Sequence, residues 1–294
     1  MKLLTFIRQG APALGVKTER GILDVATAAA GREAPASVME VIAQGASAIA
    51  ALADLAAATP ADSSAWLRED DLAFGPCVTE PKKIICVGLN YRKHAEETKA
   101  AIPEYPILFN KFDNTIAAHG QDIAIPRTTD KLDYEAELVI VIGKKTKYVS
   151  REQALDHVFG YCCANDLSAR DLQLRTPQWM LGKIGDDFSP IGPYLVTADE
   201  VGNPNDLAVK TYVNGERRQN SNTSDMIFAC DEIVSYISQH LTLLPGDIIL
   251  TGTPEGVVLG YPKEKRVYLK PGDVVTIEIE KLGSLTNRFV TEEA

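Results

Sequence analysis

Acidic residues alternate along one short segment of the chain, directly before a run of apolar residues. The segment reads Asp133-Tyr-Glu135-Ala-Glu137, and residues 138–142 are all apolar. Alternate side chains of a β-strand point to the same face, so the three carboxylates are predicted to lie together. The apolar run is typical of a strand buried on both faces. Carboxylates gathered at the end of such a strand repel one another unless a cation neutralises them, which favours a metal site over the alternative of a solvated acidic strand end.

Length, composition and charge narrow the classes of protein. The 294 residues are enough for one large domain, or for a small domain and a larger one. Hydrophobic residues make up 45% and charged residues 24%, which is ordinary for a globular protein. A net charge of −10 makes nucleic acid and anionic membrane poor partners for the chain. No apolar stretch reaches the length of a membrane span, and residues 1–10 are predicted to form a strand, not a signal peptide.

The five cysteines indicate a reducing compartment. Their number is odd, two are adjacent, and Cys86 and Cys162 lie inside apolar runs. Buried thiols in the cytoplasm fit this pattern better than a disulfide framework does. The chain has no CxxC pair, which leaves a structural zinc site unsupported, and no GxGxxG or P-loop pattern, which leaves nucleotide binding unsupported.

The chain is predicted to divide near residue 75. Strand signals at residues 3–8 and 13–25 precede an Ala-rich helix that begins at the capping-box pattern Ser37-Val-Met-Glu40 and ends at Pro60. Beyond residue 76, strand signals dominate, including a hairpin turn at Asn214-Gly215, with one amphipathic helix over residues 231–241. We therefore predict an α+β, mostly β protein, with a small N-terminal α+β domain over 1–75 and a larger domain over 76–294.

Further oxygen ligands and a base can be proposed from the residues alone. A hard divalent cation takes oxygen ligands from separate stretches of chain, and Asp166 ends another apolar run, where it is either a third ligand or a helix N-cap. An all-carboxylate set favours Mg²⁺ or Mn²⁺ over Zn²⁺. His94 and Glu97 stand three residues apart; on a helix they share a face, and the carboxylate then orients the imidazole as a general base. A solvated, charged helix is the alternative for this pair.

Two other segments have an ordinary explanation beside a functional one. Lys183 lies in a Gly-rich loop and is either an anchor for a substrate carboxylate or a solvated lysine. Thr253 follows a predicted buried strand over residues 248–250. Hydroxyl and backbone N–H groups at a strand end can hold an anion, but a simple turn also accounts for them.

In combination, these segments resemble the fumarylacetoacetate hydrolase family, in order, over about residues 80–280. The matching segments are Gly88-Leu-Asn-Tyr91 with His94 and Glu97, Pro106-Ile-Leu-Phe-Asn-Lys111, Tyr134-Glu-Ala-Glu-Leu138, Asn165-Asp166-Leu-Ser-Ala-Arg170-Asp171, Lys183, and Gly252-Thr-Pro-Glu-Gly256. The resemblance implies a mixed β-sandwich roll, usually a homodimer. It is closest to the short bacterial-type members, which are similar to acylpyruvases, the 2,4-diketo acid hydrolases.

The resemblance also implies roles for individual residues. Its metal ligands, for Mg²⁺ or Mn²⁺ (with Ca²⁺ an option in crystals), fall on Glu135, Glu137 and Asp166, which changes the interpretation of Asp166 from cap to ligand. Its catalytic groups fall on His94 and Glu97, in a helix that closes over the substrate, and on Lys183. Its substrate contacts fall on Lys111, Arg170, Gln173 and Thr253. The loop Lys183-Ile184-Gly185-Asp186 departs from the family's Lys-Ser-Phe-Asp or Lys-Gly-Phe-Asp and is expected to reshape the pocket beside the lysine.

The family's substrates are small 2-oxo acids, and several reactions follow from one metal–enolate site. Hydrolysis of the C–C bond of a 2,4-dioxo acid of the acylpyruvate type comes first, because His94 and Glu97 supply a base that activates water; the products are pyruvate, or a substituted pyruvate, and a carboxylic acid. Decarboxylation of oxaloacetate, a lyase reaction, and isomerisation of a 2-hydroxy-diene-dioate are the alternatives. A non-catalytic small-molecule-binding protein is the second alternative, although suitable residues occupy all the implied metal and dyad positions.

Overall fold

A large sheet forms the centre of the computed structural model, which describes residues 1–293. Its twelve strands include the path β4-β3-β2-β1-β14-β12-β11-β17-β6-β7, with β5 paired to β1 and β8 to β14. The strand bounds are β1 Lys2–Arg8, β2 Ala11–Thr18, β3 Gly21–Asp24, β4 Trp66–Leu67, β5 Phe74–Gly75, β6 Ile84–Gly88, β7 Ile107–Lys111, β8 Ile116–Ala117, β11 Ala136–Ile142, β12 Val158–Asn165, β14 Ser189–Thr197 and β17 Ile248–Leu250. Most neighbours are antiparallel, but β17 and β6 run parallel, so the sheet is mixed.

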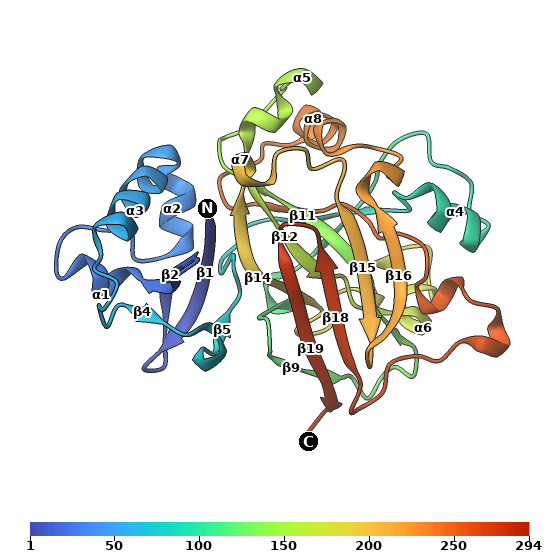
Figure 1. The fold of residues 1–294 in the computed structure, drawn as a ribbon. Coiled ribbons are helices and arrows are strands. Elements are labelled where there is room, and N and C mark those ends of the chain that lie inside the picture. The colour runs from blue at the N-terminus through green and yellow to red at the C-terminus, as the bar shows by residue number, and fades with distance from the viewer. Residues whose placement is uncertain (294) are drawn as a thin grey trace.

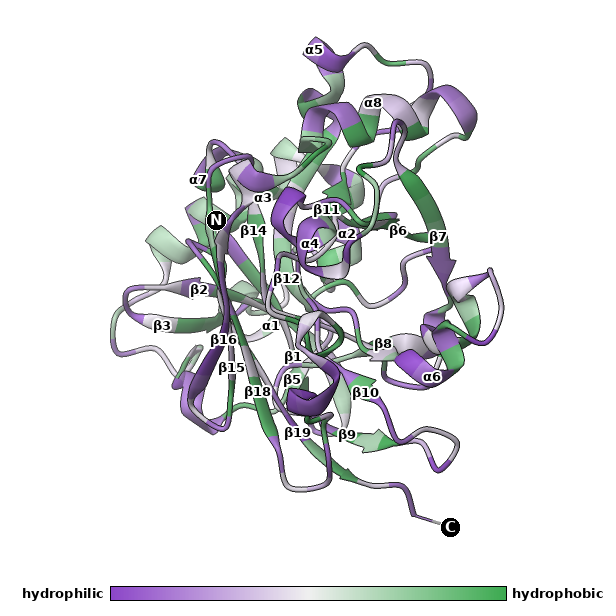
Figure 2. Cartoon of the chain, turned by 90° about the vertical axis from the view of Figure 1, so that its right-hand side faces the viewer, coloured by the Kyte–Doolittle hydropathy of each residue, from purple (hydrophilic) through white to green (hydrophobic). Residues whose placement is uncertain are grey.

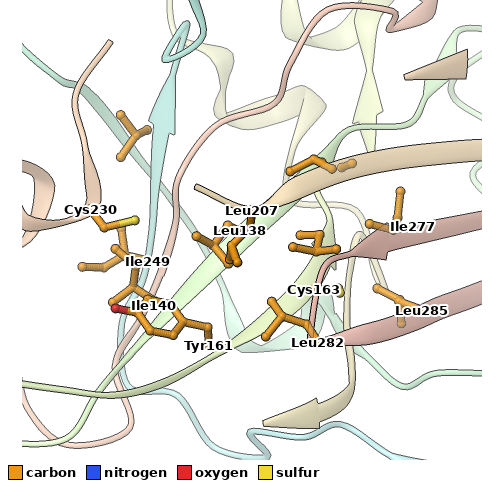
Figure 3. Close-up of a cluster of buried hydrophobic side chains, with 14 of the residues drawn as sticks. Leu138, Ile140, Tyr161, Cys163, Leu207, Cys230, Ile249, Ile277, Leu282 and Leu285 are labelled. Carbon is orange, nitrogen blue, oxygen red and sulfur yellow. The ribbon is translucent and has the colours of Figure 1, made fainter. Parts of the chain in front are cut away.

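A second sheet of five strands packs on the first, and its order is β16-β15-β18-β19-β9 (Figure 1). Its strands are β9 Asp122–Ile125, β15 Ala208–Val213, β16 Glu216–Asn222, β18 Val274–Ile279 and β19 Gly283–Thr291. Figure 3 shows side chains of both sheets in one apolar core: Leu138 and Ile140 come from β11, and Ile277 and Leu285 come from the second sheet. The predicted α+β, mostly β fold with a β-sandwich is confirmed.

Strand β11 is buried on both faces, as its apolar run predicts. Leu138, Ile140 and Ile142 belong to the core between the two sheets. Val139 and Val141 point to the opposite face, where the large sheet and the N-terminal helices share a second core. All seven residues of β11 are buried. The metal-site candidates Glu135 and Glu137 therefore stand at the start of a strand that is buried along its whole length.

The N-terminal segment extends the large sheet and covers it with helices, drawn in blue in Figure 1. Strand β1 pairs antiparallel with β14, placing Leu3 opposite Leu195. The helices here are α1 Val25–Ala29, α2 Val38–Gln44 and α3 Ala46–Ala58. Ser37 caps α2 as predicted, accepting the Glu40 N–H, but the expected single helix is two helices because Gly45, at φ +65°, breaks it. The domain boundary at residue 75 stays a prediction.

The remaining helices lie around the sandwich. They are α4 Arg92–Thr98, α5 Arg151–Ala154, α6 Arg170–Gln173, α7 Ala198–Val201 and α8 Cys230–His240, the last confirming the amphipathic helix predicted from the sequence. Helix α4 is hydrophilic along most of its length (Figure 2) and lies on the side of the sandwich away from the N-terminal segment (Figure 1). Asn214 and Gly215 take φ values of +51° and +81° between β15 and β16, as the predicted type I′ turn requires. Within residues 1–293, no helix is both long and apolar enough to cross a membrane.

Candidate metal-binding active site

Three buried carboxylates meet where strand β11 begins and strand β12 ends. The two strands are antiparallel, with Glu137 opposite Ala164. The residue just before β11, Glu135, therefore lies beside the residue just after β12, Asp166, whose N–H donates to the Glu135 carbonyl at 2.9 Å. One oxygen from each of Glu135, Glu137 and Asp166 lies within 4.8 Å of the others. The strand register thus brings together the three residues that the sequence proposed as ligands.

Asp133 does not join this cluster, and the expectation that it shares a face with the two glutamates was wrong. The strand is interrupted after Asp133, which is the last residue of the short strand β10 (Leu132–Asp133). Strand β10 pairs antiparallel with β13 (Ser168–Ala169). Its carboxylate accepts hydrogen bonds from Arg170 Nε at 2.8 Å and from the N–H groups of Val258 and Leu259 at 2.9 Å. Asp133 therefore fixes the loop that begins at Val258, a role that the alternating pattern did not indicate.

Buried cations neutralise part of the negative charge. Lys183 Nζ donates to Glu135 Oε2 and to Asp166 Oδ2, both at 2.6 Å. Arg170 Nη2 lies 2.8 Å from Glu135 Oε1. Lys111 Nζ donates to Asp166 Oδ1 at 2.5 Å and to the Phe188 carbonyl at 2.6 Å. Each of these side chains is almost fully buried, so the pairs act at short range in a poorly polarisable environment.

The pKa values of the two glutamates are shifted in opposite directions. Burial raises the pKa of Glu137 well above its ordinary value, and the charges of Asp166 and Glu135 raise it further. Burial acts on Glu135 in the same direction, but Lys183 and Arg170 outweigh it and hold the pKa of that carboxyl at about 2. Glu137 accepts the Gly252 N–H at 2.8 Å, and no cationic side chain of residues 1–293 forms an ion pair with it.

These observations fit a divalent cation. A bound ion supplies the positive charge that Glu137 lacks, and a set of carboxylate oxygens from separate strands suits a hard ion such as Mg²⁺ or Mn²⁺. The protein's own cations already balance Glu135 and Asp166, so Glu137 is the carboxylate whose ionisation depends most on the ion.

The predicted His–Glu pair is present on helix α4. His94 Nδ1 lies 2.8 Å from Glu97 Oε1, and Glu97 Oε2 accepts the Gly256 N–H at 3.0 Å. Because the carboxylate faces Nδ1, that nitrogen carries the proton of the neutral ring and Nε2 is left as an acceptor. This arrangement is the one that a general base requires.

One cavity of about 760 Å³ connects these groups. The predicted site residues that line it are His94, Glu97, Glu135, Glu137, Arg170, Gln173, Lys183 and Thr253. Lys111 and Asp166 are in contact with each other and are not among the lining residues, so substrate contact by Lys111 stays a prediction. Part of the wall is apolar, where the rings of Phe109 and Trp179 meet edge to face with centroids 5.9 Å apart.

Other lining residues carried no signal in the sequence. Leu259, Tyr261, Lys263 and Arg266 come from a loop far along the chain and reach the cavity only because the fold returns that loop to helix α4. The unusual loop beside Lys183 has no direct effect on the cavity, since neither Ile184 nor Gly185 lines it. A side chain at position 185 would instead meet the ring of Phe188, which is already buried there.

The sequence is similar to known proteins over most of its length. The family model described as fumarylacetoacetate (FAA) hydrolase C-terminal matches residues 83–290. A fumarylacetoacetate hydrolase domain-containing protein 2 homolog of Dictyostelium discoideum is 52% identical over 219 residues, which are 71% of each chain. A mitochondrial oxaloacetate tautomerase of Xenopus laevis is 45% identical over 226 residues, which are 76% of this chain and 70% of the relative.

Solved structures give the same family. Fumarylacetoacetate hydrolase from Exiguobacterium antarcticum superposes with a TM-score of 0.84 at 35% identity, covering 99% of this chain and all of the other. Fumarylpyruvate hydrolase from Pseudomonas aeruginosa, solved with Mn²⁺ and pyruvate, has a TM-score of 0.67 at 36% identity, covering 74% and 92%. A 2-hydroxyhepta-2,4-diene-1,7-dioate isomerase from Mycobacterium marinum has a TM-score of 0.75 at 31% identity over the whole of both chains. By its sequence and its fold, this chain belongs to the fumarylacetoacetate hydrolase family.

Proposed function

We propose that this protein is a divalent-metal enzyme that interconverts the keto and enol forms of 2-oxo acids, with oxaloacetate as a substrate. The observation that carries the proposal is the single cavity that joins two of the three clustered carboxylates, Lys183 and the His94–Glu97 pair. The resemblance to the family, together with the His94–Glu97 pair, placed C–C hydrolysis first. The 45% identity to an oxaloacetate tautomerase over three quarters of the chain now favours tautomerisation.

Glu135, Glu137 and Asp166 would hold the ion, which we propose to be Mg²⁺ or Mn²⁺. When bound, a divalent ion polarises the 2-oxo group and stabilises the negative charge that develops on its oxygen. The Pseudomonas relative that was solved with Mn²⁺ and pyruvate supports an ion and a 2-oxo acid sharing this site.

The chain's own residues move the proton. His94 Nε2 accepts a proton from C3 of the keto acid, and the electrons of that C–H bond become the C2–C3 double bond. The oxygen on C2 takes a proton from Lys183, whose pKa is raised because Asp166 and Glu135 outweigh the effect of its burial. Exchange with water through the cavity mouth then restores both groups. Arg170 and Gln173, joined by a 2.9 Å hydrogen bond, would orient the substrate carboxylate.

Hydrolysis of a 2,4-dioxo acid is the second candidate. The same His94 Nε2 can take a proton from water, and the resulting hydroxide attacks C4. The C3–C4 bond then breaks, its electrons form the C2–C3 double bond of the pyruvate enolate, that enolate takes back the proton held by His94, and the C4 fragment leaves as a carboxylic acid. The fold and 36% identity shared with a fumarylpyruvate hydrolase favour this reaction specifically.

A panel of three substrates separates these functions. Metal-free protein is mixed with Mg²⁺ or Mn²⁺. The first assay follows the decay of the enol absorbance of oxaloacetate. The second assay measures the pyruvate released from oxaloacetate, from an acylpyruvate and from fumarylpyruvate. We expect faster loss of the enol than with metal alone and no pyruvate from oxaloacetate. Pyruvate from the dioxo acids would support hydrolysis, pyruvate from oxaloacetate would support decarboxylation, and no acceleration at all would support a non-catalytic binding protein.

The variant His94→Ala tests the base. We expect turnover to fall by about 10²–10⁴-fold, because either reaction needs His94 Nε2 as proton acceptor. Mn²⁺ affinity should stay unchanged, since the proposed metal ligands are Glu135, Glu137 and Asp166 and do not include His94. Undiminished turnover in this variant would remove His94 from the mechanism.

A further inference from the structure

The buried side chain of Gln219 links the second sheet to the wall of the active-site cavity. Gln219 lies on β16 and is 1% exposed. Its Oε1 accepts hydrogen bonds from the Ala136 N–H at 3.1 Å and from the Thr211 hydroxyl at 2.6 Å. Its Nε2 donates to the Thr253 hydroxyl oxygen at 2.9 Å and to the Pro254 carbonyl at 2.8 Å. One amide group therefore joins the start of β11 to the loop after β17.

Two of these partners determine the orientation of the Gln219 amide. A backbone N–H only donates and a carbonyl only accepts, so Ala136 requires the amide oxygen and Pro254 requires the amide nitrogen. Turning the amide over would place two donors together at Ala136 and two acceptors together at Pro254. The second N–H of the amide is therefore directed at Thr253, whose hydroxyl oxygen is an acceptor in this bond.

The direction of that bond decides where the Thr253 hydroxyl proton can go. A hydroxyl group has one proton to donate, and accepting the N–H of Gln219 does not use it. Within residues 1–293, no protein group accepts this proton, whereas the nearby Thr251 hydroxyl donates to the Leu138 carbonyl at 2.9 Å. Thr253 lines the cavity and Thr251 does not. The Thr253 hydroxyl can therefore donate to a molecule bound in the cavity.

Thr253 is also held close to the carboxylate cluster. The N–H of Gly252, its neighbour in the chain, donates to Glu137 at 2.8 Å. Ala136, which donates to Gln219, directly precedes Glu137 in the sequence. The Gln219 amide therefore sets the position of the Thr253 hydroxyl relative to one of the proposed metal ligands.

We infer that Gln219 is a positioning residue, which makes the Thr253 hydroxyl a hydrogen-bond donor to an oxygen of the bound 2-oxo acid. This rests on the proposed function, which holds the head of that acid at the clustered carboxylates. A donor directed into the cavity suits a carboxylate or carbonyl oxygen, and a hydrogen bond to a charged oxygen is the stronger kind. Gln219 does not line the cavity, so it acts on the ligand only through Thr253.

Calorimetric binding of pyruvate at saturating Mn²⁺ tests this inference, because changes in metal affinity then do not enter the result. We expect Thr253→Val to weaken pyruvate binding roughly tenfold, since the variant has no hydroxyl to donate. Gln219→Met keeps the length of the side chain but has no N–H group, which leaves the Thr253 proton able to turn to the Pro254 carbonyl. We expect this variant to weaken binding by a similar factor, roughly five- to tenfold.

A double-mutant cycle separates positioning from a general structural effect. If Gln219 acts through Thr253, Gln219→Met should weaken pyruvate binding by less than about twofold when Thr253→Val is already present. A structural disturbance of the cavity would weaken binding by the same factor in both backgrounds. Thr211→Val is the matched control. It removes one hydrogen bond to the same amide, but Ala136 still holds the amide oxygen, so pyruvate affinity should stay within about twofold of the wild type.

Neutron diffraction on the wild type keeps the test valid if Gln219→Met does not fold. In crystals exchanged into heavy water and soaked with Mn²⁺ and pyruvate, we expect the Thr253 deuteron to be directed at a pyruvate oxygen. One amide deuteron of Gln219 should be directed at the Thr253 oxygen. A Thr253 deuteron directed at the Pro254 carbonyl would overturn the inference.

The outcomes separate this inference from the proposed function. Pyruvate affinity that is unchanged in Thr253→Val, or that Gln219→Met lowers equally in both backgrounds, would overturn the inference alone. A loss in Thr211→Val as large as that in Gln219→Met would do the same. Failure of pyruvate to bind the wild type in the presence of Mn²⁺ would overturn the proposed head site, and the inference with it.

Discussion

Glu135 and Glu137 stand two residues apart at the start of the same strand, yet cationic side chains surround Glu135 and other carboxylates surround Glu137. Glu135 is bonded to Lys183 and faces Arg170, so its charge is stabilised by the protein itself. Glu137 faces two other carboxylates and is buried, so its charge is stabilised only when a cation arrives. Neutralising one or the other should therefore affect the stability of the metal-free protein to different extents, even though both side chains belong to the same cluster.

Glu137→Gln should leave the metal-free protein about as stable as the wild type, within roughly 1 kcal/mol, because Gln imitates the protonated carboxyl. Glu135→Gln should cost roughly 3–5 kcal/mol, because it leaves Lys183 and Arg170 buried without a partner. Both variants should bind Mn²⁺ far more weakly. Urea unfolding of the metal-free proteins and calorimetric titration with Mn²⁺ measure these effects. Equal destabilisation by the two changes would contradict the account of the charges.

Individual residues were predicted well where one local pattern sufficed and poorly where two segments had to meet. The spacing of His94 and Glu97 predicted a shared face if the segment is helical, with a solvated helix as the alternative, and the two side chains do meet on one helix turn. The strand break after Asp133 was hidden, because Leu132–Leu138 reads as one continuous alternation. The pairing of Arg170 with Glu135 depends on where α6 packs, which no local spacing encodes.

At the scale of elements, the side chain of Glu97 links helix α4 to the loop after β17. Glu97 bonds both His94 and the Gly256 N–H, and α4 packs on the 3₁₀ helix Val258–Gly260. A methyl group at Gly260 would overlap the Glu97 carboxylate. The position of the helix and the orientation of the imidazole are therefore coupled.

Gly260→Ala should reduce turnover by up to about 10²-fold, because it displaces Glu97 and misaligns His94. Global stability should change little, since Gly260 lies in a short surface turn and is not fully buried. A double-mutant cycle with Glu97→Gln supplies the control: the combined loss should be smaller than the sum of the two losses, because both act through one carboxylate. Strictly additive losses would show that Gly260 does not act through Glu97.

Strands and turns with strong local signals were predicted from the sequence, including β6, β11, the β15–β16 hairpin and helix α8. The helix over the N-terminal segment was predicted too long. Its apolar stripe continues across Gly45, but the left-handed backbone at that residue ends α2 and starts α3. The spacing of hydrophobic residues predicts which face of a helix is buried, but it does not predict where the helix axis changes direction.

At the scale of the whole molecule, the sandwich confirms the fold expected from the resemblance, whereas assembly and location stay predictions. Nothing in the local patterns predicted that β1 would join β14 and carry the N-terminal strands onto the large sheet. The cytoplasmic location is an expectation from the cysteines, while the Xenopus relative is named as mitochondrial. The homodimer is an expectation from the resemblance alone.

We expect a mass of twice 31.9 kDa when light scattering is measured on the protein as it leaves a size-exclusion column. The expectation comes from the resemblance to the family; a second copy would also cover exposed apolar side chains such as Ile102, Tyr105 and Leu174, which are 55%, 61% and 59% exposed. A mass of 31.9 kDa at micromolar concentration would contradict the prediction.

The central claim, that Glu135, Glu137 and Asp166 hold a divalent ion, is tested most directly by anomalous diffraction. Crystals soaked with Mn²⁺ and pyruvate would be measured at the manganese absorption edge. The account predicts one strong anomalous peak in contact with an oxygen of each of the three carboxylates. A map with no peak at that position, and Glu135 and Asp166 still paired with Lys183, Arg170 and Lys111, would contradict it.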